Sequence, residues 1–466
     1  MKLYVLLLIV ILFVTSILIQ PLLASGSIPS ATKIQAILQQ RIEKEKQSVG
    51  IVVGLINSKN SRIVSYGKLN QTSSRQPDGD TVFEIGSISK VFTSLLLADM
   101  VERKELSLKD PISKFLPQSV KVPTRKGREI TLLDLATHTS GLPRLPNNFE
   151  PKDMENPYAD YTVEQLYSFL SNYQLTRDIG AEYEYSNLGA GLLGHILSLK
   201  AGIDYENLVI TRICQPLKMG STRIKLSQEM QARFATGHNQ FRQPVKNWDI
   251  PTLAGAGALR STANDLLKFI AANLDLSKSN LSPAIQKTHL VQHDHDTDSP
   301  DVKMGLGWYI LKKYGREIIS HNGVTGGYRT FIAFEKKKRL GVVVLSNSVN
   351  NIDDIGLHLL EPKFELVKHT PPKERKPIVL DPKIYDAYVG QYQLAPEFIL
   401  TISKEQDKLY TQATDQPRFE LFPESETEFF VKEFDAKITF VKNKQGQVTN
   451  LIMHQNGQNL EAKKIQ

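Results

Sequence analysis

The chain has 466 residues, of which 41% are hydrophobic and 23% are charged; this composition is ordinary for a globular protein, and the length is enough for two or three domains. The formal net charge of +8 is small for this length, so we attribute it to solubility rather than to attraction to anionic envelope polymers or membranes, and we expect no nucleic-acid partner. The only cysteine, Cys214, excludes a disulfide within the chain, and its neighbours Ile213 and Pro216 favour a small buried side chain over a nucleophile.

The N-terminus carries a targeting pattern. Lys2 is followed by an apolar run from Leu3 to Ile19 and then by small residues up to Gly26. This order is typical of a secretory signal peptide, so residues 1–26 are expected to be one; because the run is long, an uncleaved membrane anchor is the alternative. With either, the mature protein leaves the cytosol and lies in the periplasm, outside the cell or on the outer side of a membrane.

Strands are predicted on both sides of a mostly helical middle region, which spans residues 105–275. The predicted strands are residues 50–56, 62–67, 317–320, 328–334 and 340–345. Within the middle region, apolar residues recur at helical spacing in residues 163–170 and 189–201. Helices and strands are therefore segregated along the chain, and distant segments must complete one sheet.

A Ser-x-x-Lys motif, Ser87 and Lys90, opens a helix predicted over residues 91–103. Residues three apart lie on one face of a helix, so the Lys90 amine is expected beside the Ser87 hydroxyl. A lysine that burial holds unprotonated is able to accept the serine proton, and the N–H groups of a helix N-terminus favour the oxyanion of acyl transfer. The motif alone is weak evidence, because many surface helices carry it.

Two more motifs follow. Residues 185–187 form Tyr-x-Asn, and residues 321–323 form His-x-Gly. The order Ser-x-x-Lys, Tyr-x-Asn, His-x-Gly resembles that of the serine β-lactamase and penicillin-binding-protein superfamily, in particular class C β-lactamases and the related D,D-carboxypeptidases, D-aminopeptidases and esterases. Four further segments are similar to segments of that family, and they are residues 81–90, 132–143, 215–219 and 257–269.

The resemblance, which covers residues 33–366, implies a β-lactamase/transpeptidase-like α/β (α+β) fold: a five-stranded antiparallel sheet flanked by helices, with a helical subdomain and the active site between them. It also implies that Ser87 is the nucleophile of an acyl-enzyme and that Lys90 or Tyr185, its pKa lowered by positive neighbours, is the general base. Asn187 would bind the acyl-side amide of the substrate. The Val324 N–H would join the Ser87 N–H in an oxyanion hole.

His321 departs from the Lys-Thr-Gly motif that is usual in class C β-lactamases. A lysine is permanently cationic and holds a carboxylate, whereas a histidine is only partly charged near neutral pH. The interaction with the acid group of β-lactams and of peptide C-termini should therefore weaken, which favours a peptidase or an esterase over a β-lactamase. Gly323 permits a close approach of the backbone to the substrate.

The C-terminal region has a different pattern. A Pro-rich charged linker, residues 370–379, separates the hydrolase domain, residues 27–369, from residues 380–466. Short runs in which apolar and polar residues alternate predict a small all-β, lipocalin-like barrel in this region. Its strands are expected at residues 398–402, 408–412, 419–422, 428–432, 437–441 and 449–454. The segment 388–392 resembles the start of a β domain appended to some members of the family.

The sequence thus predicts a secreted serine hydrolase that acts through an acyl-enzyme on a small-molecule or peptide substrate: D-Ala-D-Ala-type or other D-amino-acid peptides, cell-wall peptides among them, or small esters. A class C-like β-lactamase and a non-catalytic penicillin- or cell-wall-peptide-binding protein are the alternatives. Neither a metal nor a cofactor is expected, and the His-Asp-His-Asp run at residues 293–296 is interpreted as a solvated loop. The oligomeric state and the role of the barrel stay open.

Overall fold

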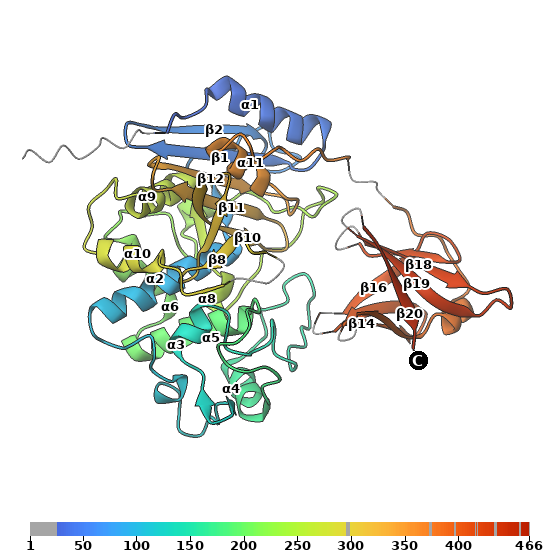
Figure 1. Cartoon of the computed structure of the whole chain (residues 1–466). Coiled ribbons are helices and arrows are strands. Elements are labelled where there is room, and N and C mark those ends of the chain that lie inside the picture. The colour runs from blue at the N-terminus through green and yellow to red at the C-terminus, as the bar shows by residue number, and fades with distance from the viewer. Residues whose placement is uncertain are drawn as a thin grey trace, which may run out of the picture.

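The structure is a computed structural model, and it describes residues 26–294, 299–371, 375–395, 398–414, 416, 418–432, 436–455 and 458–465. It consists of a larger body of helices around a sheet and a smaller β-barrel, joined by the segment after α11 (Asp353–Leu360) (Figure 1). The apolar run Leu3–Ile19 lies outside the described residues. Within them, no helix combines the length and the apolar character that crossing a bilayer requires.

The central sheet has eight antiparallel strands in the order β2-β1-β12-β11-β10-β9-β8-β7. Their bounds are β1 (Gly50–Asn57), β2 (Ser61–Gly67), β7 (His293–Asp294), β8 (Val302–Met304), β9 (Tyr309–Lys313), β10 (Arg316–Val324), β11 (Arg329–Glu335) and β12 (Leu340–Ser346). The five predicted strands are β2, β1, β12, β11 and β10. The sheet has eight strands, so the prediction of five is corrected by the addition of β9, β8 and β7. Tyr314 and Gly315 both have positive φ, 53° and 71°, in the two-residue turn that adds β9, while β7 and β8 are too short to show a period of two.

Both faces of the sheet are buried, which explains the nearly continuous apolar run of β1. Ile51, Val53 and Leu55 pack in one cluster with α1 (Ala31–Gln39) and α11. Val52 points to the other cluster, which contains α2 (Ser89–Glu102), α9 (Ala263–Asn273) and α10 (Ser282–Thr288). In Figure 1 these two groups of helices lie on opposite sides of the strands.

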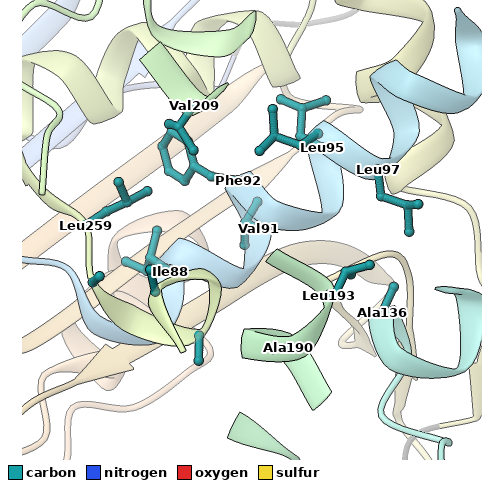
Figure 2. Packing of buried hydrophobic residues seen from close by; sticks show 14 of the residues in the cluster. Ile88, Val91, Phe92, Leu95, Leu97, Ala136, Ala190, Leu193, Val209 and Leu259 are labelled. Carbon is teal, nitrogen blue, oxygen red and sulfur yellow. The ribbon is translucent and has the colours of Figure 1, made fainter. Parts of the chain in front are cut away.

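Helix α2 runs through the centre of the body, and all its residues from Ser89 to Met100 are buried. Figure 2 shows Val91, Phe92 and Leu95 of this helix among apolar side chains of its neighbours, including Leu193 of α5 (Asn187–Ala201). Because α2 is buried on every side, its start is fixed by packing on all faces. The residue before the helix, Ile88, is fully buried too.

The remaining helices confirm the predicted helical middle region. They are α3 (Leu132–Ala136), α4 (Val163–Asn172), α5 (Asn187–Ala201), α6 (Tyr205–Val209), α7 (Gln228–Gln231) and α8 (Ala254–Gly257), with π-helical turns at Gln40–Lys44 and Ile210–Cys214 and 3₁₀ turns at Gly86–Ile88 and Ile112–Lys114. The short strand pairs are β3 (Val82–Glu84) with β6 (Arg260–Thr262) and β4 (Thr124–Arg125) with β5 (Arg128–Glu129). Ser186 caps α5, its hydroxyl accepting from the Gly189 N–H, and Gly202 ends the helix with φ 71°.

The C-terminal region forms a closed antiparallel barrel of eight strands. They are β13 (Gly390–Ala395), β14 (Phe398–Glu405), β15 (Lys408–Ala413), β16 (Arg418–Pro423), β17 (Glu428–Phe430), β18 (Ala436–Lys442), β19 (Val448–Gln455) and β20 (Gln458–Lys464), preceded by a 3₁₀ helix at Pro382–Ala387. The barrel and six of its strands confirm the prediction. Strands β13 and β20 were not predicted; in β20 Ala462 is the one buried residue, which leaves no apolar alternation in the sequence.

Candidate active site

Ser87 lies in a tight turn between β3 and α2. Gly86, with φ 50°, precedes it, and a Cβ built on Gly86 would lie 2.8 Å from the Val324 nitrogen. Only glycine satisfies both the left-handed conformation and this lack of space. The turn therefore brings the backbone of Ser87 next to the end of β10, where the His-x-Gly motif is located.

Three predicted site residues meet at the Ser87 hydroxyl. The Ser87 Oγ lies 3.0 Å from Lys90 Nζ and 2.6 Å from the Tyr185 hydroxyl. Lys90 Nζ also donates to Asn187 Oδ1 at 2.9 Å and to the Ala256 carbonyl oxygen at 2.7 Å. The side chains of the first two motifs, which are about a hundred positions apart in the chain, thus form one hydrogen-bonded cluster.

Burial sets the charge state of this cluster. It lowers the pKa of Lys90 well below the usual lysine value, and the nearby Arg144 guanidinium lowers it further. Burial also raises the pKa of Tyr185, and the opposing effects of Arg144 and of the hydrogen bond to Ser87 are smaller. The expected lowering of the tyrosine pKa is therefore corrected: Arg144 does lower the pKa of Tyr185, but burial outweighs this effect and the net pKa is raised. The raised pKa keeps Tyr185 a neutral phenol, and the lowered pKa of Lys90 shifts it toward the neutral amine.

His321 is neutral as well. It is 1% exposed, it stacks on the Tyr309 ring at 5.0 Å between centroids, and burial followed by the charge of Lys90 lowers its pKa to about 3. The prediction that His321 is partly charged near neutral pH is therefore corrected, because burial disfavours the charged imidazolium. Its Nδ1 lies 2.6 Å from the Asn322 carbonyl oxygen, which only accepts, so Nδ1 carries the proton and Nε2 is an acceptor.

Three of the predicted residues, Ser87, Asn187 and Val324, line the same small cleft, together with Gly86. Ser186 is the N-cap of α5, so Asn187 is free of that role; its Nδ2 donates to the Tyr158 hydroxyl at 3.1 Å. The structure therefore places the predicted nucleophile, the amide ligand and the predicted oxyanion strand around one opening.

Two site residues were missed in the sequence. The Arg144 guanidinium lies over the Tyr185 ring, with Cζ 5.0 Å from the centroid, and Arg144 directly follows the segment 132–143 that resembles the family. Tyr158 lines the cleft next to Trp248, 5.4 Å between ring centroids. The segment 132–143 was a usable signal for Arg144, but no local pattern marks Tyr158, which reaches the site through a loop.

Other features singled out in the sequence lie away from this cluster. His293 and Asp294 form strand β7, Asp294 pairs with Lys303 at 2.7 Å, and residues 295 and 296 lie outside the described residues. No group of three or more His, Cys, Asp or Glu side chains in the described part of the chain is arranged to hold a metal ion. Cys214 is buried, as predicted, and burial raises the pKa of its thiol to about 12.

Replacing Gly323 with alanine is expected to disrupt the site with little effect outside it. A Cβ at Gly323 would overlap the Ile85 carbonyl oxygen and crowd Thr330 Oγ1 at 2.5 Å, so β10 must move away from the turn that carries Ser87. We expect acylation to slow by a factor of about ten to a thousand, on the scale of losing an oxyanion donor. The measurement is the acylation rate constant for Gly323→Ala.

The matched control is Gly220→Ala, because a Cβ at Gly220 meets nothing within 4 Å. Gly323→Ala acylating as fast as the Gly220→Ala control would contradict a functional contact between β10 and the Ser87 turn.

Known proteins share both parts of this structure. The Beta-lactamase family matches residues 34–360, and a Domain of unknown function (DUF3471) matches residues 374–464. The D-alanyl-D-alanine-carboxypeptidase/endopeptidase AmpH of Escherichia coli (strain K12) is 31% identical over 313 residues, which cover 64% of this chain and 79% of the relative. Penicillin-binding protein 4* of Bacillus subtilis (strain 168) is 26% identical, with 85% of this chain and 91% of the relative covered.

Solved structures agree with these matches. The Beta-lactamase/D-alanine Carboxypeptidase from Yersinia pestis has a TM-score of 0.63 and 25% identity, and the match covers 72% of this chain and 99% of that chain. A class C beta lactamase from Rhodobacter sphaeroides has a TM-score of 0.60 at 24% identity and covers 71% of this chain and 97% of that chain. The predicted fold and the resemblance to class C enzymes and D-alanine carboxypeptidases are confirmed.

Proposed function

Since this chain belongs to the β-lactamase family and is a serine hydrolase of that family, we propose that it is an exported enzyme that hydrolyses peptide-like amides ending in a D-residue with a free carboxylate. Small esters are a second substrate class, because the same acyl-enzyme forms from them. The observation that carries the proposal is the cluster around Ser87, in which Lys90 is desolvated, Tyr185 is a neutral donor and Arg144 is the neighbouring fixed cation.

Lys90 is the general base in this proposal. A neutral amine has two N–H donors and one lone pair. The Asn187 Oδ1 and the Ala256 carbonyl oxygen are acceptors only, so they take both donors. The lone pair is then left for the Ser87 hydroxyl at 3.0 Å, which supports proton transfer from Ser87 to Lys90.

The reaction follows from these positions. The Ser87 Oγ attacks the substrate carbonyl while Lys90 takes its proton, and the developing oxyanion lies at the N–H groups of Ser87 and Val324. Tyr185, whose raised pKa keeps it protonated, gives a proton to the departing amine and regains one from Lys90. The C–N bond breaks and the acyl group stays on Ser87. Water then attacks this ester while Lys90 takes its proton, the bond to Ser87 Oγ breaks, and Lys90 returns the proton to Ser87 Oγ as the acid is released.

Arg144 supports the preference for a substrate carboxylate. His321 presents a lone pair at Nε2 and carries no charge at neutral pH, so it repels an anion rather than binding it. Arg144 is exposed, its guanidinium is above the Tyr185 ring, and it has no hydrogen-bond acceptor for that group among the described residues. Arginine binds carboxylates in a bidentate geometry, so we assign the C-terminal carboxylate to Arg144.

The proposal is tested by turnover of a panel that contains a D-Ala-D-Ala peptide, a D-amino-acid amide, p-nitrophenyl esters and nitrocefin. We expect kcat/KM for the peptide or an ester to exceed that for nitrocefin, since the neutral His321 replaces the lysine of class C enzymes. Faster hydrolysis of nitrocefin than of every peptide and ester would favour the β-lactamase alternative, which several relatives named Beta-lactamase support. A protein that turns over nothing in the panel but binds penicillin would favour the binding-protein alternative.

Arg144→Gln should lower kcat/KM about tenfold to a hundredfold for the D-Ala-D-Ala peptide, because a charge-assisted contact with the carboxylate is lost. The same peptide with a C-terminal carboxamide should be affected less than threefold. Lys109→Gln is the matched control, since it removes one exposed positive charge at a residue that does not line the cleft. An equal loss for carboxylate and carboxamide peptides would remove Arg144 from carboxylate recognition.

The apolar run Leu3–Ile19 supports the part of the proposal that concerns export. The N-terminal sequence of protein recovered outside the cytosol checks this step: a start near residue 27 supports cleavage, and an intact Met1 supports an anchor.

A further inference from the structure

The interior of the C-terminal barrel is filled in one half and hollow in the other. Aromatic side chains fill the first half: Tyr388 stacks on Phe440 at 4.2 Å between centroids, and both contact Phe429. The second half contains a cavity of about 290 Å³. Closed antiparallel barrels of this size either fill their interior with side chains or leave room for one small ligand. This barrel is filled in one half and hollow in the other.

Among the residues that the structure describes, the wall of this cavity is mainly apolar and carries no charge. Leu400, Phe419, Val431, Ile438 and Met453 line it from five different strands or strand ends. An apolar cavity of about 150 Å³ stays dry and binds benzene, so a cavity about twice that size holds a neutral ligand of about a dozen non-hydrogen atoms. An ionised ligand is disfavoured, because the lining offers it no partner of opposite charge.

One polar atom in the wall lacks a partner. Thr411 on β15 is 7% exposed, it faces inward with Leu409 and Ala413, and it lines the cavity. In the described part of the chain its Oγ1 has no hydrogen-bond partner, although its neighbours on β14 and β16 form regular strand pairs. Buried hydroxyls almost always have a partner, so this one is a candidate donor to a polar ligand atom once its side chain turns toward the cavity.

We propose that the barrel binds a small, uncharged, mainly apolar molecule whose hydroxyl or carbonyl group hydrogen-bonds to Thr411. The site is separate from the cluster at Ser87, and it gives the C-terminal domain a binding role of its own. This binding does not depend on the proposed hydrolase substrate, so either proposal stands if the other fails. The occupant enters a preformed pocket, in which the apolar contacts supply affinity and Thr411 supplies selectivity.

The test uses the full chain and a matched pair of probes, 2-naphthol and naphthalene, which differ by one hydroxyl group. We expect each to bind one saturable site per chain, and 2-naphthol to bind more tightly. In Thr411→Val, which keeps the shape and removes the hydroxyl, the affinity for 2-naphthol should fall about tenfold and that for naphthalene should stay within twofold. Thr401→Val, the same exchange on β14 at a residue that is not in the cavity wall, is the control.

A second variant, Ala436→Leu, adds volume to the wall and should weaken both probes by at least tenfold. The thermal unfolding midpoint of each variant is measured alongside, so that loss of binding is separated from loss of the barrel. Absence of saturable binding of both probes to the wild-type chain would overturn the proposal. So would folded Thr411→Val and Ala436→Leu proteins that bind both probes like the wild type.

Discussion

Ser87→Ala is expected to remove all turnover and all covalent labelling by penicillin or fluorophosphonate probes. Ser87 Oγ is the hydroxyl that contacts both Lys90 and Tyr185. The nearby Ser186 is unsuited to the role, because its hydroxyl donates to the Pro143 carbonyl oxygen at 2.7 Å and accepts from the Gly189 N–H at 2.8 Å. Loss of a catalytic nucleophile reduces kcat by several orders of magnitude. The measurement is kcat for the best substrate, together with mass spectrometry of the labelled peptide.

The control for this experiment is Ser113→Ala, which alters an exposed serine that hydrogen-bonds Glu129 far from the cluster. This variant should label and turn over like the wild type. An adduct on any residue other than Ser87, or undiminished labelling of Ser87→Ala, would assign the nucleophile elsewhere.

Lys90→Met is expected to slow acylation by about a hundredfold or more, the scale of losing a positioned general base. Methionine has a similar length and no lone pair that accepts a serine proton. It leaves the Asn187 Oδ1 and the Ala256 carbonyl oxygen without a donor, so the unfolding midpoint is measured for the same sample. Lys59→Met, at an exposed turn lysine, controls for the substitution itself.

The pH dependence of kcat/KM tests which protonation state of Lys90 is the active one. Only the unprotonated amine accepts the Ser87 proton, so kcat/KM falls about tenfold per pH unit below the pKa of Lys90, which burial places well below the usual lysine value. Above it the rate is flat up to the ordinary tyrosine range, because the pKa of Tyr185 is raised and its proton is kept. His321 adds no step between pH 5 and 8, since its pKa is about 3. An inflection that persists in Lys90→Met would assign the base to another group.

Tyr185→Phe distinguishes Tyr185 as the general acid that protonates the leaving group from Tyr185 as the general base. A tyrosine that protonates the departing amine matters for amides, whereas p-nitrophenolate departs without a proton. We therefore expect a loss of about a hundredfold for peptide acylation and a clearly smaller loss for p-nitrophenyl esters. Equal losses on both substrate types, larger than those of Lys90→Met, would make Tyr185 the base instead.

Part of the site was predictable because its geometry is local. Ser87 and Lys90 are three positions apart at a helix start, and the helical repeat alone places them together. Tyr185 and Asn187 were found through the order of the three motifs rather than through any local pattern. Most strands of the sheet and of the barrel were predicted too, since alternation and turn residues are properties of short segments.

The sequence by itself determined the family, the nucleophile motif, the two-part organisation and the all-β character of the C-terminal region. The tertiary structure alone decided the pKa shifts of the buried groups, the position of Arg144 over the Tyr185 ring and the hollow half of the barrel. The pKa values of Lys90, Tyr185 and His321 depend on water excluded by several packed elements at once, and burial shifted two of them against the expectation. Likewise, a cavity is what remains between side chains of many strands, so no segment of the sequence contains it.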